Sequence, residues 1–185
     1  MAEWEAPARA LERAIAEFAA QRPISRAGVA ELADRAGVGR ATVYNRYDSP
    51  LDLFIQVLYA DLEPGHRWEE QRQAEGGYSA EEQLRLATGE VADHMARFRA
   101  VYRNALADPA DRGVYEALVR HFIDYRLAFM ARITHPDLPA VSRQVVAQFV
   151  SHGFAGAIEA WLRDASVAQE DLVDAVVACA PVQWG

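Results

Sequence analysis

The sequence predicts an all-α protein of about nine helices, on the strength of three observations. Apolar residues recur at spacings of three and four along almost the whole chain, as they do on one face of a helix. No segment keeps the period of two that a half-buried strand requires. Proline, glycine and capping residues divide the apolar stretches into segments of helical length. We therefore expect an N-terminal three-helix domain over residues 1–56 and a larger helical domain over residues 57–185.

Three helices are predicted in the N-terminal domain. The first ends before the Arg-Pro pair at residues 22–23, and the second runs through residues 29–36. The apolar stripe of the first consists of Leu11, Ala14, Ile15 and Phe18. Gly37 follows the second helix at the position where a left-handed C-cap is favoured. The third helix covers about residues 40–47.

A fourth helix is predicted to begin at Ser49. Serine favours the N-cap, Pro50 suits the first helical position, and Asp52 is spaced to reach back to the cap. We expect this helix to end at the Glu-Pro-Gly run of residues 63–65, because proline and glycine interrupt helices. A polar connection through residues 76–77 is expected to follow.

The next helix is predicted to open with a capping box made by Ser79 and Glu82. Its apolar stripe reaches Phe98, and we expect a break before Tyr102. The Asp-Pro pair at residues 108–109 then starts a further helix.

Two helices complete the predicted fold. The proline-containing run 135–139 separates them from the preceding helix, and a long helix covers about residues 141–163. The last helix, capped by Ser166 and Gln169, stops before Pro181.

Composition excludes several classes of protein. No apolar run reaches the ~20 residues that cross a bilayer, and the N-terminus lacks the pattern of a signal peptide, so we expect a cytoplasmic protein with no membrane partner. Cys179 is the only cysteine, which excludes an intrachain disulfide and a cysteine-based zinc site. The five histidines do not fall at metal-ligand spacing, and no nucleophile elbow, phosphate loop or carboxylate pair occurs. We expect no metal, no cofactor and no enzymatic activity.

The charge of the chain is unevenly distributed. The net charge of −8 argues against a protein that coats nucleic acid through bulk electrostatics. Residues 1–56 carry seven arginines against eight acidic side chains, whereas residues 57–185 carry twelve against nineteen. The acidity therefore belongs mainly to the second part of the chain.

Residues 29–47 form a candidate helix-turn-helix, the arrangement whose second helix enters the DNA major groove. If Val43 points inward, an advance of about 100° per residue places Tyr47 on the same side, so both can pack on the preceding helix. The residues on or beside the outward face are Arg40, Ala41, Thr42, Tyr44, Asn45 and Arg46. This face is small, polar and basic.

Several of these side chains suit the DNA backbone. Gly39 and Ala41 let a helix approach the groove closely, and the N–H groups at the helix start can hold a phosphate. The hydroxyls of Thr42 and Tyr44 suit phosphate oxygens, which position a protein without reading sequence. Arg26 is a further candidate for a phosphate contact.

Three side chains suit base edges. Arg40 and Arg46 can pair with phosphate or with guanine, and Asn45 can pair with adenine. A simpler interpretation is that this is a solvated basic face of an ordinary helical protein. The local pattern alone leaves both interpretations open.

A longer run of residues carries a resemblance to a known family. The matching positions are Phe18, Leu32, Ala33, Arg35, Ala36, Gly37, Val38, Arg40, Thr42, Val43, Tyr44, Tyr47, Ser49 and Leu53. With them, residues 11–58 resemble the N-terminal DNA-binding domain of the TetR family of transcriptional regulators. The run departs from the family pattern at Gly28, Gly39, Asp48 and Pro50.

The resemblance implies a homodimeric regulator that binds a pseudo-palindromic site in double-stranded DNA, most simply a repressor released by an unknown small-molecule effector. The alternative is an all-helical small-molecule binding protein whose helix-turn-helix no longer reads DNA, and Asp48 and Pro50 motivate it. A protein that packages DNA without sequence preference is a second alternative, and the acidity of the chain opposes it.

The resemblance also implies that the C-terminal helices carry a dimer interface and an effector pocket. An apolar stripe on the long helix indicates the interface, with Val146, Val150, Gly153, Phe154, Ala157 and Trp161. The candidate pocket residues are His94, Phe98, Tyr102, His121, Tyr125 and Phe129. In each case the alternative is ordinary packing within one subunit.

Overall fold

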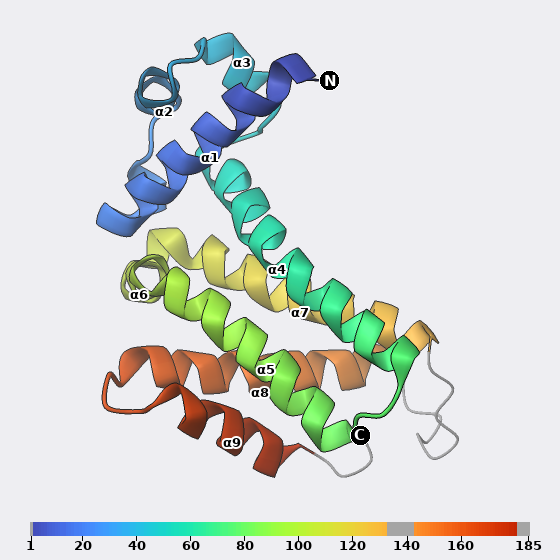
Figure 1. Cartoon of the computed structure of the whole chain (residues 1–185). Coiled ribbons are helices and arrows are strands. Elements are labelled where there is room, and N and C mark those ends of the chain that lie inside the picture. Colours follow the sequence, from blue (N-terminus) through green and yellow to red (C-terminus); the bar gives the residue numbers. More distant parts are fainter. Residues whose placement is uncertain (1, 133–142, 181–185) are drawn as a thin grey trace. The chain divides into compact units, whose positions relative to one another are not determined.

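The computed structural model describes residues 2–132 and 143–180, and throughout these residues the regular structure is helical (Figure 1). Nine α-helices and two short 3₁₀ helices are found in this part of the chain. The α-helices are α1 (Ala2–Gln21), α2 (Val29–Ala36), α3 (Arg40–Tyr44), α4 (Pro50–Glu75), α5 (Ala80–Arg97), α6 (Arg99–Ala107), α7 (Arg112–Arg132), α8 (Arg143–Arg163) and α9 (Gln169–Cys179). The 3₁₀ helices are η1 (Ile24–Arg26) and η2 (Pro109–Asp111). The prediction of an all-α fold is confirmed.

The chain divides into two compact units. The first comprises Met1–Asp61 and Phe98–Tyr115, and the second comprises Leu62–Arg97 and Glu116–Gly185. The first unit is therefore discontinuous in sequence, because the chain leaves it and later returns. The predicted boundary between residues 56 and 57 concerns independently folding domains, and it stays a prediction.

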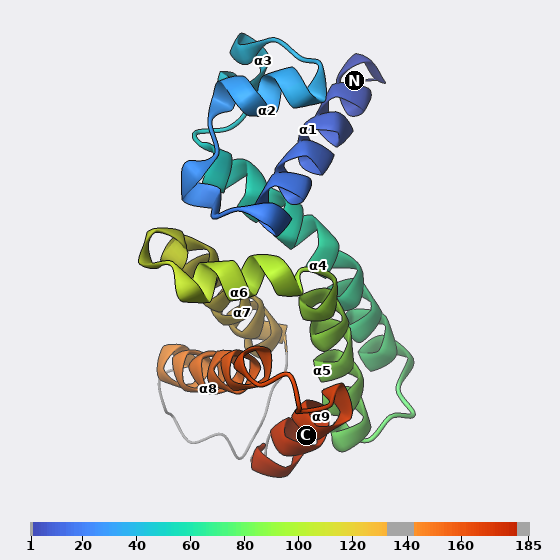
Figure 2. The same ribbon diagram turned by 90° about the vertical axis from the view of Figure 1, so that its left-hand side faces the viewer.

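The first unit is built on the apolar stripe of α1. Leu11, Ile15 and Phe18 are fully buried, and α1 contacts both α2 and α6. Figures 1 and 2 show α1, α2 and α3 gathered together. Complete burial of side chains of this size contributes about 1.5–3 kcal/mol each to the free energy of folding. The stripe predicted from the sequence is thus the core of this unit.

The turn between α2 and α3 depends on Gly37. Its φ of 67° and ψ of 32° lie in the left-handed region, and its N–H bonds back to the last turn of α2. Glycine adopts this conformation without the steric cost that a Cβ atom brings. The predicted C-cap is confirmed.

Helix α3 is three residues shorter than predicted. It ends at Tyr44, and the N–H groups of Arg46 and Tyr47 both bond to the carbonyl oxygen of Val43. This tightened turn leads directly into the start of α4. There Ser49 Oγ accepts the N–H of Asp52 at 3.0 Å, as expected of an N-cap, but the carboxylate of Asp52 accepts the N–H of Asp48 at 3.2 Å instead of that of Ser49.

The prediction that α4 ends at residues 63–65 is wrong. Helix α4 continues through Pro64 to Glu75, so the connection to α5 is only residues 76–79. A proline inside a helix removes one backbone hydrogen bond, because it has no N–H. The turns beyond Pro64 make compensating contacts: the ring of His66 stacks on Tyr125, and Arg72 pairs with a glutamate of α5 at 2.8 Å. Tertiary packing here outweighs local helix propensity.

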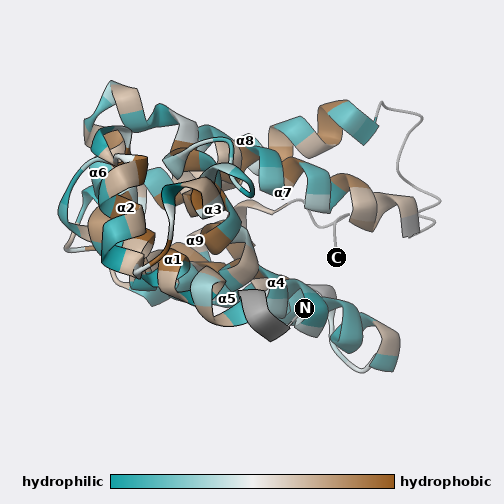
Figure 3. Ribbon diagram, turned by 90° about the horizontal axis from the view of Figure 1, so that it is seen from above, coloured by the Kyte–Doolittle hydropathy of each residue, from teal (hydrophilic) through white to brown (hydrophobic). Residues whose placement is uncertain are grey.

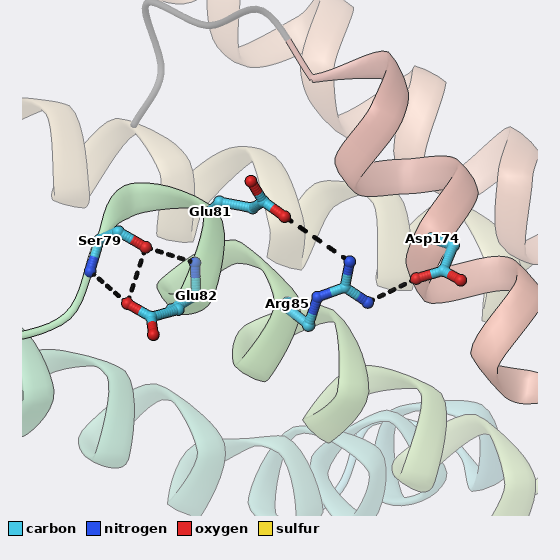
Figure 4. A network of polar contacts seen from close by, with 5 residues as sticks. All are labelled: Ser79, Glu81, Glu82, Arg85 and Asp174. Carbon is cyan, nitrogen blue, oxygen red and sulfur yellow. Dashed lines mark hydrogen bonds and ion pairs between the residues drawn. The ribbon is translucent and has the colours of Figure 1, made fainter.

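The start of α5 is the predicted capping box (Figure 4). Glu82 accepts hydrogen bonds from the N–H and the hydroxyl of Ser79, and Ser79 Oγ accepts the N–H of Glu82 at 3.2 Å. One turn later, Arg85 pairs with Glu81 on its own helix and with Asp174 on α9. The same close-up view shows both ion pairs, of which the pair with Asp174 joins α5 to α9 within the second unit.

The predicted cap of α9 is wrong. Ala168 occupies the N-cap, and the carboxylate of Asp171 accepts its N–H at 3.1 Å. Ser166 instead donates its N–H and its hydroxyl to Asp164, while Gln169 donates to Asp93 of α5. The acidic residue at the third helical position therefore makes the hydrogen bond to the N-cap that the prediction assigned to Gln169.

The remaining predicted boundaries have mixed outcomes. The break before Tyr102 is confirmed, because α5 ends at Arg97 and Phe98 lies in the turn before α6. The Asp-Pro pair at residues 108–109 starts η2 rather than an α-helix, and α7 follows directly. The predicted stops at residues 135–139 and at Pro181 lie outside the described residues.

Polar and apolar residues are interleaved along the helices (Figure 3). Each helix consequently offers an apolar side for packing and a polar side for water. In the described part of the chain, no helix has both the length and the apolar character needed to cross a membrane.

Replacement of Gly37 by alanine should lower the free energy of unfolding by about 1–2 kcal/mol, because it forces a Cβ atom into the left-handed region. The substitution Gly37→Asn is the matched control. It should cost less, because asparagine tolerates this conformation better than alanine does. Urea unfolding followed by circular dichroism measures both variants, and equal losses for the two would contradict the conformational explanation.

Candidate functional site

Helix α3 places its side chains as helical geometry predicts. The side chains of Val43 and Tyr47 are buried, with 1% and 9% of their surface exposed. Tyr44 is 65% exposed. The other predicted contact residues in this segment are exposed, except for half-buried Thr42; they are Gly39, Arg40, Ala41, Asn45 and Arg46. The inward pair thus fixes which side of α3 faces solvent, while the DNA-binding role of the outward residues stays a prediction.

Two arginines of the first unit take part in its packing. The guanidinium groups of Arg22 and Arg35 lie 4.3 and 5.7 Å from the centre of the Phe18 ring. Both also pair with Glu31, at 2.6 and 2.9 Å, and the hydrogen bond from Arg22 is the main reason that the pKa of Glu31 is lowered. These two cations therefore secure α1 to α2.

The last predicted DNA contact in this unit, Arg26, is exposed at the end of η1. A carboxylate holds the start of this short helix. Asp111 of η2 accepts the N–H of Ile24 at 2.6 Å and the N–H of Ser25 at 2.8 Å, and it is only 2% exposed. Sequence reasoning missed Asp111, because nothing in the local pattern relates it to residues 86 and 87 positions earlier.

The second unit contains an aromatic stack of His66 from α4 with His121 and Tyr125 from α7. The ring centres of His66 and Tyr125 are 3.8 Å apart, and those of His66 and His121 are 4.8 Å apart. The hydroxyl of Tyr125 donates to Glu69 Oε2 at 2.6 Å. His66 and Glu69 were missed because the sequence analysis ended α4 before them. The helical spacing of the two residues would have placed them on one face.

Burial keeps the aromatic stack neutral. It lowers the pKa of His121 to about 4, with smaller contributions from the neighbouring charges of His66 and His94. Burial also lowers the pKa of His66 and raises the pKa of Tyr125. Near neutral pH the stack therefore presents uncharged rings with polar edges, a surface suited to a largely apolar molecule.

The other predicted pocket residues are distributed over both units. His94 is 1% exposed on α5, and Phe129 is half-buried on α7 with the guanidinium of Arg126 5.5 Å from its ring centre. Phe98 and Tyr102 belong to the first unit, where burial raises the pKa of Tyr102. The structure thus brings together His121 and Tyr125, and it places His94 near enough to influence His121.

The predicted interface residues on α8 lie on different sides of the helix. Gly153 is exposed, and Val146, Val150 and Ala157 are half-buried. Phe154 packs edge-on against Phe122 of the same chain, with ring centres 5.1 Å apart. Trp161 is 4% exposed, and its indole N–H donates to the carbonyl oxygen of Val167. The last two side chains therefore pack within their own subunit.

A different set of residues forms the exposed side of α8. Val145 is 59% exposed and Phe149 is 72% exposed. Gly153 and Gly156 follow on the same side, because spacings of four, four and three keep residues on one helical face. We call these four residues the α8 apolar face. The periodicity of the sequence could not separate this face from the buried one, because both are apolar.

The pKa of His121 makes stability depend on pH. Its pKa is about 4 in the folded chain against 6.5 as the ordinary value. Between these values the unfolded chain binds a proton that the folded chain does not, so the free energy of unfolding should fall as the pH drops from 6.5 to 4. The variant His121→Gln should lose part of this decrease. Urea unfolding at several pH values measures it, and parallel curves for variant and wild type would show that His121 is not responsible.

Comparison with known proteins finds a family model that matches the N-terminal part of the chain. Residues 11–57 match the model of the bacterial regulatory proteins of the tetR family. No curated protein sequence matches the chain.

Solved structures match nearly the whole chain in fold. A putative TetR-family transcriptional regulator from Rhodococcus sp. has a TM-score of 0.60 at 18% identity, over 94% of this chain and 95% of that one. The fatty acid degradation regulator FadR from Bacillus halodurans has a TM-score of 0.59 at 14% identity, over 97% and 95%. The transcriptional regulator FadR from Bacillus subtilis, solved in complex with stearoyl-CoA, has a TM-score of 0.59 at 15% identity, over 92% and 95%.

The family model covers the helix-turn-helix with its inward pair, and the structural likeness extends through the helices of the second unit. Residues 11–57 therefore match the N-terminal model of the tetR family of bacterial regulatory proteins, and nearly the whole chain shares its fold with TetR-family regulators of known structure.

Proposed function

We propose that this protein is a sequence-specific DNA-binding transcriptional regulator, a repressor that a small-molecule effector releases from a pseudo-palindromic site. The observation that carries the proposal is the orientation of α3. Burial of Val43 and Tyr47 leaves Arg40, Asn45 and Arg46 exposed on or beside the opposite side. Arginine and asparagine are the side chains that read guanine and adenine bidentately in the major groove.

Selection of bound sequences from a random duplex library by the full-length protein tests this proposal. We expect enrichment of a palindrome, because a two-fold dimer presents two copies of α3 about 34–36 Å apart. Arg40→Ala or Asn45→Ala should weaken binding to that duplex by about 10-fold to 100-fold, the value of one bidentate base contact. Fluorescence anisotropy measures the affinity.

The matched control is Arg120→Ala, which removes the same charge from an exposed position on α7. It should leave the affinity unchanged. Absence of any enriched sequence at low salt would favour the alternative, a small-molecule binding protein whose helix-turn-helix no longer reads DNA. Binding without sequence preference that salt erases would indicate the DNA-packaging alternative.

We propose that the α8 apolar face is the surface on which two copies meet. Val145 and Phe149 are among the most exposed large apolar side chains of the described residues. Within residues 2–132 and 143–180, no atom outside the adjoining helical turns lies within 4 Å of the point where a Cβ would project from Gly153 or Gly156. Glycines beside a protruding aromatic ring allow two helices to approach closely.

Replacement of Phe149 by glutamate should convert the dimer to monomer, because it places a charge in the centre of the α8 apolar face. The fold of each chain should be unaffected, since Phe149 is 72% exposed. Trp68→Glu is the matched control, as it changes an aromatic residue of similar exposure on α4. Sedimentation velocity measures the molar mass, and a dimer that survives in Phe149→Glu would contradict this interface.

The effector is proposed to bind in the second unit, next to the aromatic stack. The stack offers neutral rings, and the Tyr125 hydroxyl and Glu69 supply polar edges. The complex of the Bacillus subtilis FadR with stearoyl-CoA is an example, in the same fold, of a ligand with a long apolar chain. Release of the selected duplex on addition of such a ligand would identify a repressor, and tighter binding would instead identify a ligand-activated binder.

A further inference from the structure

The first unit contains a buried carboxylate, that of Asp111, which is not one of the predicted DNA contacts. Asp111 is 2% exposed, and both of its oxygens are occupied by backbone N–H groups of η1. Its own position is fixed locally. Asp108 accepts the N–H of Ala110 at 3.0 Å with its side chain and the N–H of Asp111 at 3.0 Å with its carbonyl oxygen.

The two N–H groups that Asp111 binds have no partner of their own within η1. The first N–H groups of any helix lack an intrahelical acceptor, and a buried donor without a partner is costly. Hydrogen bonds to an ionised carboxylate are about twice as strong as neutral ones, and the distances of 2.6 and 2.8 Å are in the range of charge-assisted bonds. Asp111 therefore fixes both the place and the direction of η1.

Arg26 is the residue whose position follows from this contact. It is the last residue of η1, one position after Ser25, and its backbone N–H closes the turn on the carbonyl oxygen of Pro23 at 3.1 Å. Its side chain is exposed. A long side chain on an exposed turn can contact one particular phosphate only if the conformation of its backbone is fixed.

We propose that Asp111 is a positioning residue for DNA binding, which holds η1 so that Arg26 contacts a backbone phosphate. The inference rests on the proposed function, since it requires that the protein binds DNA. The chain supplies this residue from a segment, Phe98–Tyr115, that is separate in sequence from the helix-turn-helix.

The salt dependence of binding distinguishes positioning from a general loss of stability. For full-length protein on the selected duplex, the slope of log K against log salt measures the number of phosphate contacts, at about 0.9 per contact. Arg26→Ala should lower the magnitude of the slope by about 1. Asp111→Asn should lower it by a similar amount, because its amide turns one acceptor into a donor that faces a backbone N–H. The double variant should show no further decrease.

Two further variants keep the test decisive. Asn104→Ala is the matched control on the same segment, because it removes the side-chain bond to the carbonyl oxygen of Ala19 without touching η1, and it should leave the slope unchanged. Asp111→Glu keeps both acceptors, so it should retain more of the slope than Asp111→Asn. If circular dichroism shows Asp111→Asn to be unfolded, the slope of Asp111→Glu is compared with that of the wild type in its place.

Each outcome has a separate meaning. A wild-type slope in Asp111→Asn, with binding intact or uniformly weaker, overturns the positioning role and leaves the proposed function standing. Decreases in slope that add in the double variant also overturn it, because Asp111 would then act independently of Arg26. Failure of the wild type to bind any duplex at low salt contradicts both proposals.

Discussion

Burial of the α1 stripe is the interaction on which the first unit depends. Leu11, Ile15 and Phe18 have no exposed surface, and the helix-turn-helix packs on the helix that carries them. Because α2 and α3 are eight and five residues long, neither has enough internal hydrogen bonds to be stable alone. Their orientation is therefore set by the apolar side chains that they bury, and the outward face of α3 is what remains after that burial.

The fold was predictable wherever a local rule governs it. Gly37 at a left-handed C-cap and Ser79 in a capping box are short-range patterns, and the structure contains both. The prediction failed at Pro64, where contacts made by His66 and Arg72 with other helices keep α4 continuous. A single sequence carries no signal for such contacts, because their energy comes from residues far along the chain.

The candidate site, too, has parts that local rules predict and parts that depend on long-range contacts. The exposed side of α3 could be predicted, because 100° per residue and one inward residue determine it. Asp111 and the aromatic stack could not be predicted, because they join residues separated by more than fifty positions. On α8 the sequence could not tell which apolar residues are exposed, and of the predicted interface residues only Gly153 lies on the α8 apolar face. Phe154 and Trp161 are as apolar as Phe149, and only the packing decides which of them is covered.

The discontinuity of the first unit has a consequence for biosynthesis. A ribosome synthesises residues 1–61 before it reaches Asp111, so the nascent helix-turn-helix exists for a time without the carboxylate that binds η1. Since translation adds roughly 5–20 residues per second, this interval lasts several seconds. During it the backbone N–H groups of Ile24 and Ser25 depend on water as acceptor. The final form of η1 is thus a late event in folding, although its residues are synthesised early.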